Sequence, residues 1–196
     1  MSDDIGPGDC LGRKLLILGD VNAGKTTLAR RILDDFRARG LGARIAIVDL
    51  APAIPPQVAA ARGVRGVGGT LEADPATGVL VVHPALEAPR LSSSSEAEAQ
   101  RKAAANKVRI DRAWPVAAGG RDIVFLNDAS IYLQAGSADE LIAKLRGAAT
   151  VVANGYFGQR LGGGELSRHE RAEMERLRDW FRLEGEVIEL GPAATP

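Results

Sequence analysis

Residues Gly19 to Thr27 read Gly-Asp-Val-Asn-Ala-Gly-Lys-Thr-Thr, and they directly follow the apolar run Leu15-Leu16-Ile17-Leu18. The stretch is a full match to the pattern G-x-x-x-x-G-K-[ST], in which a loop joins a strand to a helix and turns backbone N–H groups toward a phosphate. The positive N-terminus of the following helix faces the same anion. The sequence therefore predicts a strand, a phosphate-binding loop and a helix, in that order.

This loop is expected to bind ATP or GTP together with Mg²⁺. The N–H groups from about Val21 to Thr26 would surround the β-phosphate, and Lys25 would bridge the β- and γ-oxygens as a catalytic cation. Thr26 would offer its hydroxyl to Mg²⁺. The residues expected to bind the nucleotide are Gly19, Asp20, Val21, Asn22, Ala23, Gly24, Lys25, Thr26 and Thr27. A degenerate loop that no longer binds nucleotide is the alternative.

Length and composition limit the remaining choices. The chain has 196 residues, which suits one α/β domain, and a formal net charge of zero, which gives no global attraction to nucleic acid or to an anionic membrane. It has one cysteine and no apolar run as long as a membrane span, so we expect a cytoplasmic protein that does not enter a membrane. We expect flexible tails at 1–12 and 191–196 around a single domain at 13–190.

Apolar runs alternate with helical patterns along the chain, which is typical of a mostly parallel sheet covered on both faces. We therefore predict an α/β fold, a three-layer α/β/α sandwich. The expected strands are Lys14–Leu18, Arg44–Leu50, Val79–His83, Ile123–Asn127, Thr150–Asn154 and Glu186–Leu190. A helix is expected over Lys25–Arg39, and capping boxes at Ser137–Glu140 and Ser167–Glu170 predict two further helix starts.

The segment 89–115 differs from the rest of the chain. Four serines precede an alanine-rich, charged stretch with a thin apolar stripe, so we expect a protruding, partly mobile helix. It could act as a lid, as an arm for a partner or as a contact to nucleic acid, or it could be a solvated helix face.

Two aspartates lie at the ends of predicted strands, at the edge where ligands bind in such folds. Asp49 and Asp128 are therefore candidate catalytic residues and, with Thr26, candidate Mg²⁺ ligands. The alternative for Asp49 is a turn cap before Pro52. Between them, Gly66–Thr70 could wrap the γ-phosphate or could be only a turn.

These motifs together resemble the SIMIBI-type branch of P-loop NTPases that contains the GPN-loop GTPases and the polynucleotide 5′-kinases. The resemblance covers most of the chain and depends on Gly19–Thr27, on Val48-Asp49-Leu50-Ala51-Pro52 with the following Ile54-Pro55-Pro56-Gln57, on Asn127-Asp128, and on Asn154. It implies that Asp49 helps to bind Mg²⁺ or to position water, and that the loop at Asn154 touches the base.

The same loop departs from the GTPase pattern Asn-Lys-x-Asp, since the chain has Asn154-Gly155-Tyr156-Phe157, and the Gly-Pro-Asn insertion is absent. ATP and GTP therefore both stay open as substrates. Tyr156 and Phe157 could stack on a base or could be buried. The glycine-rich stretch 158–164 with Arg168 and Arg171 could close as a lid, or these could be exposed arginines on a helix.

Three functions follow from these features. The first is a Mg²⁺-dependent NTP hydrolase that acts as a regulatory switch for a protein partner. The second is a kinase that transfers the γ-phosphate to a hydroxyl of a polynucleotide 5′ end or of a small metabolite. The third is a noncatalytic nucleotide sensor. The sequence does not indicate nucleic acid through its net charge, and it leaves open whether the chain forms a homodimer.

Overall fold

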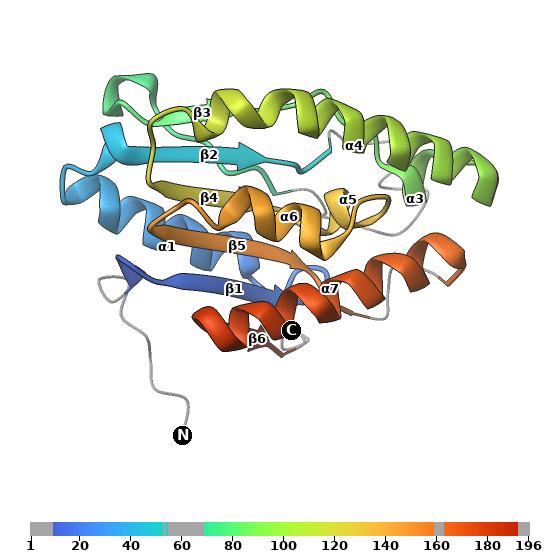
Figure 1. Cartoon of the computed structure of the whole chain (residues 1–196). Coiled ribbons are helices and arrows are strands. Elements are labelled where there is room, and N and C mark those ends of the chain that lie inside the picture. Colours follow the sequence, from blue (N-terminus) through green and yellow to red (C-terminus); the bar gives the residue numbers. More distant parts are fainter. Residues whose placement is uncertain (1–9, 53, 55–68, 159–162, 192–196) are drawn as a thin grey trace.

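Six strands form one sheet in the order β3-β2-β4-β5-β1-β6, and every neighbouring pair is parallel (Figure 1). The structure is a computed structural model that describes residues 10–52, 54, 69–158 and 163–191. The strands are β1 (Lys14–Gly19), β2 (Ile45–Asp49), β3 (Leu80–Val82), β4 (Ile123–Asn127), β5 (Thr150–Tyr156) and β6 (Glu186–Leu190). All six predicted strands are therefore confirmed, with ends that differ by no more than two residues.

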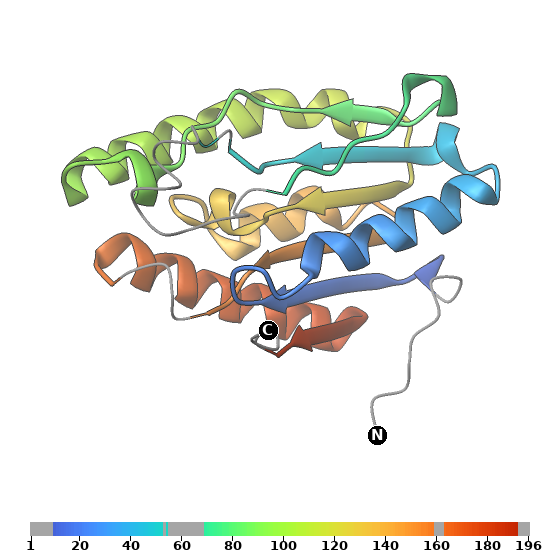
Figure 2. The same ribbon diagram turned by 180° about the vertical axis from the view of Figure 1, so that it is seen from behind.

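Helices cover both faces of this sheet and make three layers. The helix α1 packs on one face through Ile32, Leu33 and Phe36, and α4, α6 and α7 cover the other face (Figures 1 and 2). The longer helices are α1 (Lys25–Ala38), α4 (Glu96–Ala118), α6 (Ala138–Leu145) and α7 (Glu165–Glu184). The short ones are η2 (Gly42–Arg44), η3 (Pro75–Thr77), α3 (Pro89–Ser92) and α5 (Ser130–Leu133). The predicted α/β architecture is confirmed, and the sheet is wholly parallel.

The helix starts were predicted with mixed success. The capping box at Ser137 is present: the Glu140 N–H donates to Ser137 Oγ and the Ser137 N–H donates to Glu140 Oε2. The capping box predicted at Ser167 is wrong, because the N-cap of α7 is Gly164, three residues earlier, and the helix begins at Glu165. Its first turn is capped from another helix, since the Leu166 N–H donates to Glu96 Oε1 at 2.7 Å.

The segment 89–115 also differs from the expected protruding helix. It forms α3 and most of α4, and α4 continues through Pro115 to Ala118. A stripe of Ala103, Asn106, Ile110 and Trp114 is buried, and Ile110 and Trp114 belong to the core cluster that includes sheet residues. The Asn106 side chain accepts from the Glu87 N–H and donates to the Glu87 carbonyl. This helix is therefore a packed layer of the domain.

The folded domain begins earlier than residue 13. Cys10 is buried in the cluster under α1, and the Gly12 N–H donates to Thr150 Oγ1 at 2.8 Å. Residues 10–12 are therefore part of the folded domain, whereas residues 1–9 lie outside the described residues. Among the helices that the structure describes, none has the length and apolar character needed to cross a membrane.

Candidate functional site

The parallel sheet places all strand carboxyl ends at one edge, and the loop after β1 lies there. This loop makes a tight turn in which Asn22 and Gly24 adopt left-handed backbone conformations, with φ of 61° and 90°. A Cβ at Gly19 would lie 3.0 Å from Ala23 Cβ and 3.1 Å from the Leu190 carbonyl oxygen. Glycine at positions 19 and 24 therefore lets the chain turn sharply from β1 into α1.

The N-terminus of α1 is open to an anion. Gly24 is its N-cap, no described side chain caps the helix, and its first turn holds no acidic residue. The first N–H groups of a helix need partners from outside the helix, and a phosphate can supply them. Lys25 and Thr26 are the first residues of this helix, so their side chains start beside those groups.

Lys25 and Asp128, two of the predicted site residues, are near enough to influence each other electrostatically. Lys25 Nζ donates to the Asp20 carbonyl oxygen at 2.7 Å. Burial lowers the pKa of Lys25, while the negative charges of Asp128 and Asp20 act in the opposite direction. Burial also raises the pKa of Asp128, and its carboxylate accepts a hydrogen bond from the Ser130 hydroxyl. The two groups therefore affect each other's pKa, although no ion pair joins them among the described residues.

Asn127, just before Asp128, is the centre of the polar network at this edge. Its Nδ2 donates to Asp49 Oδ1 and to the Gly69 carbonyl oxygen, both at 2.8 Å. Its Oδ1 accepts from Asn154 Nδ2 at 2.7 Å and from Thr26 Oγ1 at 3.4 Å. One buried amide thus joins the ends of β2, β4 and β5 to the first turn of α1.

Asp49 lies in this network, but its oxygens already have donors. Oδ1 accepts from Asn127 Nδ2 and from the Ala51 N–H at 2.9 Å, and Oδ2 accepts from the Leu71 N–H at 2.7 Å. The side chain is buried, with 1% of its residue surface exposed. Asp49 therefore combines the expected turn cap with a position next to the site, and it holds the segment at 69–71 in place.

The expected contact of Asn154 with a base needs correction. Asn154 is 2% exposed, its Oδ1 accepts from the Asp128 N–H at 3.0 Å, and its Nδ2 is bound to Asn127. Since both ends of its amide are engaged inside the sheet edge, it positions Asp128. Phe157 is not open for stacking on a base either, because the guanidinium groups of Arg171 and Arg178 lie over its ring, 4.4 and 5.1 Å from the ring centre.

Two expected loops lie partly outside the described residues. Of Gly66–Thr70, only Gly69 and Thr70 are described, and a Cβ at Gly69 would lie 3.5 Å from Thr26 Oγ1. Of the lid candidate at 158–164, residues 159–162 are outside the described part. Arg168 and Arg171 are exposed on α7.

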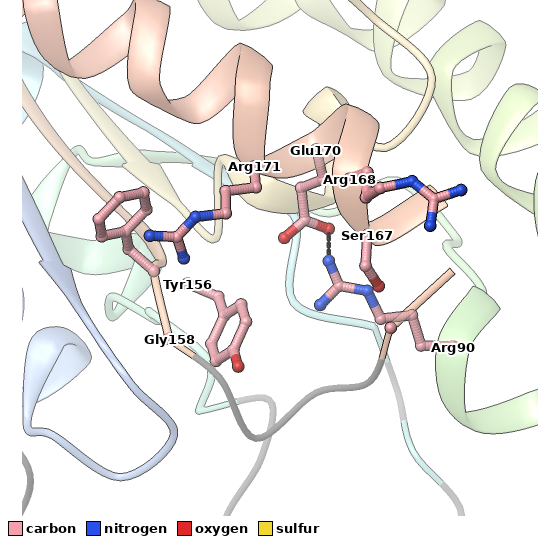
Figure 3. Close-up of a pocket in the computed structure, with 9 residues that line it drawn as sticks. Arg90, Tyr156, Gly158, Ser167, Arg168, Glu170 and Arg171 are labelled. Carbon is pink, nitrogen blue, oxygen red and sulfur yellow. Dashed lines mark ion pairs between the residues drawn. The ribbon is translucent and has the colours of Figure 1, made fainter. Parts of the chain in front are cut away.

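Sequence reasoning missed a pocket of about 150 Å³ that shares Arg90 with a hollow at Asp128. Its residues come from α3, from the end of β5 and from the start of α7, and Figure 3 shows Arg90 joined to Glu170 by an ion pair. Tyr156, predicted as a base contact, lines this pocket, and the Arg90 guanidinium lies 5.5 Å from its ring centre. Arg90 and Glu170 are 80 positions apart, so no local pattern indicates their pairing.

The described residues contain no group of three or more His, Cys, Asp or Glu side chains able to hold a metal ion. Mg²⁺ is commonly held by one or two carboxylates together with substrate phosphates, and Thr26 and Asp128 are oxygen donors of the kind it prefers. These two oxygen donors could therefore join an Mg²⁺ ion that is held mainly by phosphate oxygens.

The chain matches no family model and no curated protein.

Proposed function

We propose that this protein binds a nucleoside triphosphate at Gly19–Thr27 and hydrolyses it with Mg²⁺, as a regulatory switch of the P-loop NTPase class. The observation that carries the proposal is the position of Lys25. It is the first residue of an uncapped helix, it follows the left-handed Gly24, and its Nζ donates to the Asp20 carbonyl oxygen within the same loop. The three-layer fold also supports the proposal, because in folds of this kind ligands bind at the carboxyl ends of the strands, where this loop lies.

In this proposal the N–H groups at the start of α1 bind phosphate oxygens, and Lys25 exchanges the Asp20 carbonyl for the β- and γ-phosphates. That exchange places its cation where negative charge develops during transfer. The low exposure of Lys25 matters, because a charge acts more strongly where water is excluded.

Thr26 and Asp128 would hold Mg²⁺, and the ion, when bound, offsets charge on the phosphate oxygens. Asp49 would keep the Leu71 and Asn127 donors in place around the site. Asn154 fixes the backbone of Asp128, which has an unusual φ of 60°, and so orients the carboxylate toward the phosphates.

The regulatory part of the proposal follows from Asn127. Its amide joins Thr26, which would touch the nucleotide, to Gly69, at the start of a described segment that leads to β3. A change at the phosphates that moves Thr26 would therefore alter a hydrogen bond that holds this segment. Such coupling between a phosphate and a loop is how many NTPases signal their nucleotide state.

Calorimetric titration of the full chain with nonhydrolysable ATP and GTP analogues, each with and without Mg²⁺, tests the binding step. Saturable binding that Mg²⁺ strengthens, together with slow release of phosphate from the preferred triphosphate, is the expected result. Absence of binding to both analogues contradicts the proposal. Binding without turnover indicates the noncatalytic sensor.

A second candidate, phosphoryl transfer to a hydroxyl, is favoured by the pocket between α3, the end of β5 and the start of α7. Arg90 lines this pocket and also a hollow of about 50 Å³ that Asp128 and Ser130 line. A hydrolase has no need of a second binding site, whereas a kinase needs one for its acceptor. Triphosphate turnover that rises several-fold when a hydroxyl acceptor is added, with phosphate appearing on the acceptor, would favour this function over hydrolysis.

A further inference from the structure

We propose that the pocket between α3, the end of β5 and the start of α7 binds an anionic group of phosphate or sulfate size, carried by a small molecule distinct from the triphosphate. This goes beyond the proposed function and does not depend on it. A chain that binds no triphosphate could still bind an anion here.

The charges of the pocket residues are unbalanced. Three arginines line it, Arg90, Arg168 and Arg171, and the described lining includes one carboxylate, that of Glu170. Ser167 adds a hydroxyl from the first turn of α7. Arginine is well suited to tetrahedral anions because its planar guanidinium presents several donors in a fixed arrangement.

Arg90 is held in place but is not fully used by the protein. Its guanidinium forms an ion pair with Glu170 and lies on the face of Tyr156 (Figure 3). Its Nε is buried and has no hydrogen-bond partner among the residues that the structure describes. A buried donor without a partner is costly, so the protein itself does not satisfy all the hydrogen-bonding capacity of this guanidinium.

The carboxyl group of Glu170 offsets the positive charge of Arg90 only in part. It is 2% exposed, and burial raises its pKa to about 7, against the opposing effect of Arg90. Near neutral pH the carboxyl is therefore partly protonated, and the pocket carries an excess of positive charge. An anion can offset that excess.

Arg171 is oriented by the aromatic ring beside it. Its guanidinium stacks on Phe157, 4.4 Å from the ring centre, and its Nε lies 3.3 Å from Glu175 Oε1. A stacked arginine loses less freedom when it binds a ligand. Arg168 lies at the rim, and Figure 3 shows its guanidinium pointing away from the Arg90–Glu170 pair.

The size of the pocket sets the class of ligand group. About 150 Å³ is below the roughly 300–1,000 Å³ of sites that enclose a drug-sized ligand. It suits one charged group rather than a nucleoside. Because Arg90 also borders the hollow at Asp128, the rest of the ligand would extend toward the candidate phosphate site.

The test uses ¹⁵N-labelled full chain with Lys25→Ala, in which binding at the phosphate loop is weakened, titrated with sodium sulfate against sodium chloride at equal ionic strength. Sulfate keeps its charge across neutral pH. We expect saturable shifts of the Tyr156, Ser167 and Arg171 amide signals with sulfate. Signals of Gly24 to Thr26 report any remaining binding at the loop separately.

Charge-reversed variants complete the design. Arg171→Glu should weaken sulfate binding at these amides by about tenfold or more, since it removes a charged donor and adds repulsion. Arg176→Glu, on the same helix and 68% exposed outside the pocket lining, should change it less than twofold. Arg90→Lys, which keeps the charge that faces Glu170, should also weaken binding while the chain stays folded.

Two results would overturn the inference about the site: no saturable shift at the pocket amides, or equal losses in Arg171→Glu and Arg176→Glu. A short 5′-phosphorylated oligonucleotide that shifts these amides at a concentration tenfold lower than sulfate would overturn the small-molecule source of the anion.

Discussion

Lys25 Nζ lies 2.7 Å from the backbone carbonyl oxygen of Asp20, so the lysine of the candidate phosphate loop is hydrogen-bonded to that same loop. The contact explains how a desolvated ammonium is tolerated there. A bound triphosphate would have to replace the Asp20 carbonyl oxygen as the hydrogen-bond acceptor of Lys25.

Lys25→Ala should weaken triphosphate binding about 100-fold, because it removes a charged donor to the phosphates. Arg31→Ala is the matched control, since it removes one positive charge from an exposed position on the same helix. It should leave the affinity within about twofold. Calorimetric titration of both variants checks this, and equal affinities in the two would remove Lys25 from the site.

Gly24→Ala and Gly40→Ala form a second matched pair. Both glycines have positive φ, 90° and 75°, and a Cβ at either would meet nothing within 4 Å. Each variant should therefore lose about 1 kcal/mol of unfolding free energy through backbone strain alone. Only Gly24→Ala should weaken nucleotide binding, because only Gly24 shapes the loop. Urea unfolding and calorimetry together separate the two effects.

Asp128→Asn should abolish the gain in triphosphate affinity that Mg²⁺ provides, since an amide replaces the carboxylate proposed to hold the ion. Affinity measured with a chelator present should stay close to that of the unchanged protein. Asp34→Asn, on the exposed side of α1, is the control. A full Mg²⁺ response in Asp128→Asn would contradict the assignment.

Asn127→Asp should destabilise the fold more than Asn127→Ala. The aspartate would place an acceptor where Nδ2 now donates to Asp49 Oδ1 and to the Gly69 carbonyl, and it would add a buried negative charge. We expect losses of about 3 kcal/mol for Asp and about 2 kcal/mol for Ala. Urea unfolding at pH 8 measures both, and an Asp variant more stable than the Ala variant would refute this view of the network.

Glu170 should make stability depend on pH. Its pKa is raised to about 7 in the fold by burial, with Arg90 and Gln134 favouring the charged form and Asp128 opposing it. The unfolded chain releases this proton near the ordinary pKa of about 4.5, so the contribution to stability is complete below that pH and declines as pH rises toward 7.

Between pH 5 and 8 the unchanged protein should therefore lose about 2 kcal/mol relative to Glu170→Gln. Glu184→Gln, exposed at the end of α7, should follow the unchanged protein. Urea unfolding at four pH values checks the slope. Parallel curves for the unchanged protein and Glu170→Gln would show that the carboxyl titrates normally.

Much of the fold could be predicted from local sequence. Strands such as Ile123–Asn127 are continuous apolar runs because both faces of the sheet are buried, and this pattern is visible without a structure. The helix after Gly24 was equally clear, since its apolar stripe and its end at Gly40 are local features.

The errors have a common physical cause, which is contact between distant positions. Glu96 caps α7 from 70 residues away and thereby moves its start ahead of the Ser167 box. Asn154 was assigned to a base, although it is buried against Asn127, a partner 27 residues earlier. The Arg90–Glu170 pair could not be predicted either, because nothing in the sequence near either residue indicates which charge it meets.

The sheet also dictates how the protein should be prepared for these measurements. Gly19 lies opposite Leu190 in the register of β1 and β6, and the described chain ends one residue later at Gly191. The described chain begins at Cys10, at the opposite edge, ahead of β1. The described chain therefore leaves the domain at Gly191, beside the candidate phosphate loop Gly19–Thr27, and begins at Cys10, at the opposite edge of the sheet. An affinity tag or fluorescent label placed ahead of Cys10 should disturb ligand binding at this loop less than one placed after Gly191.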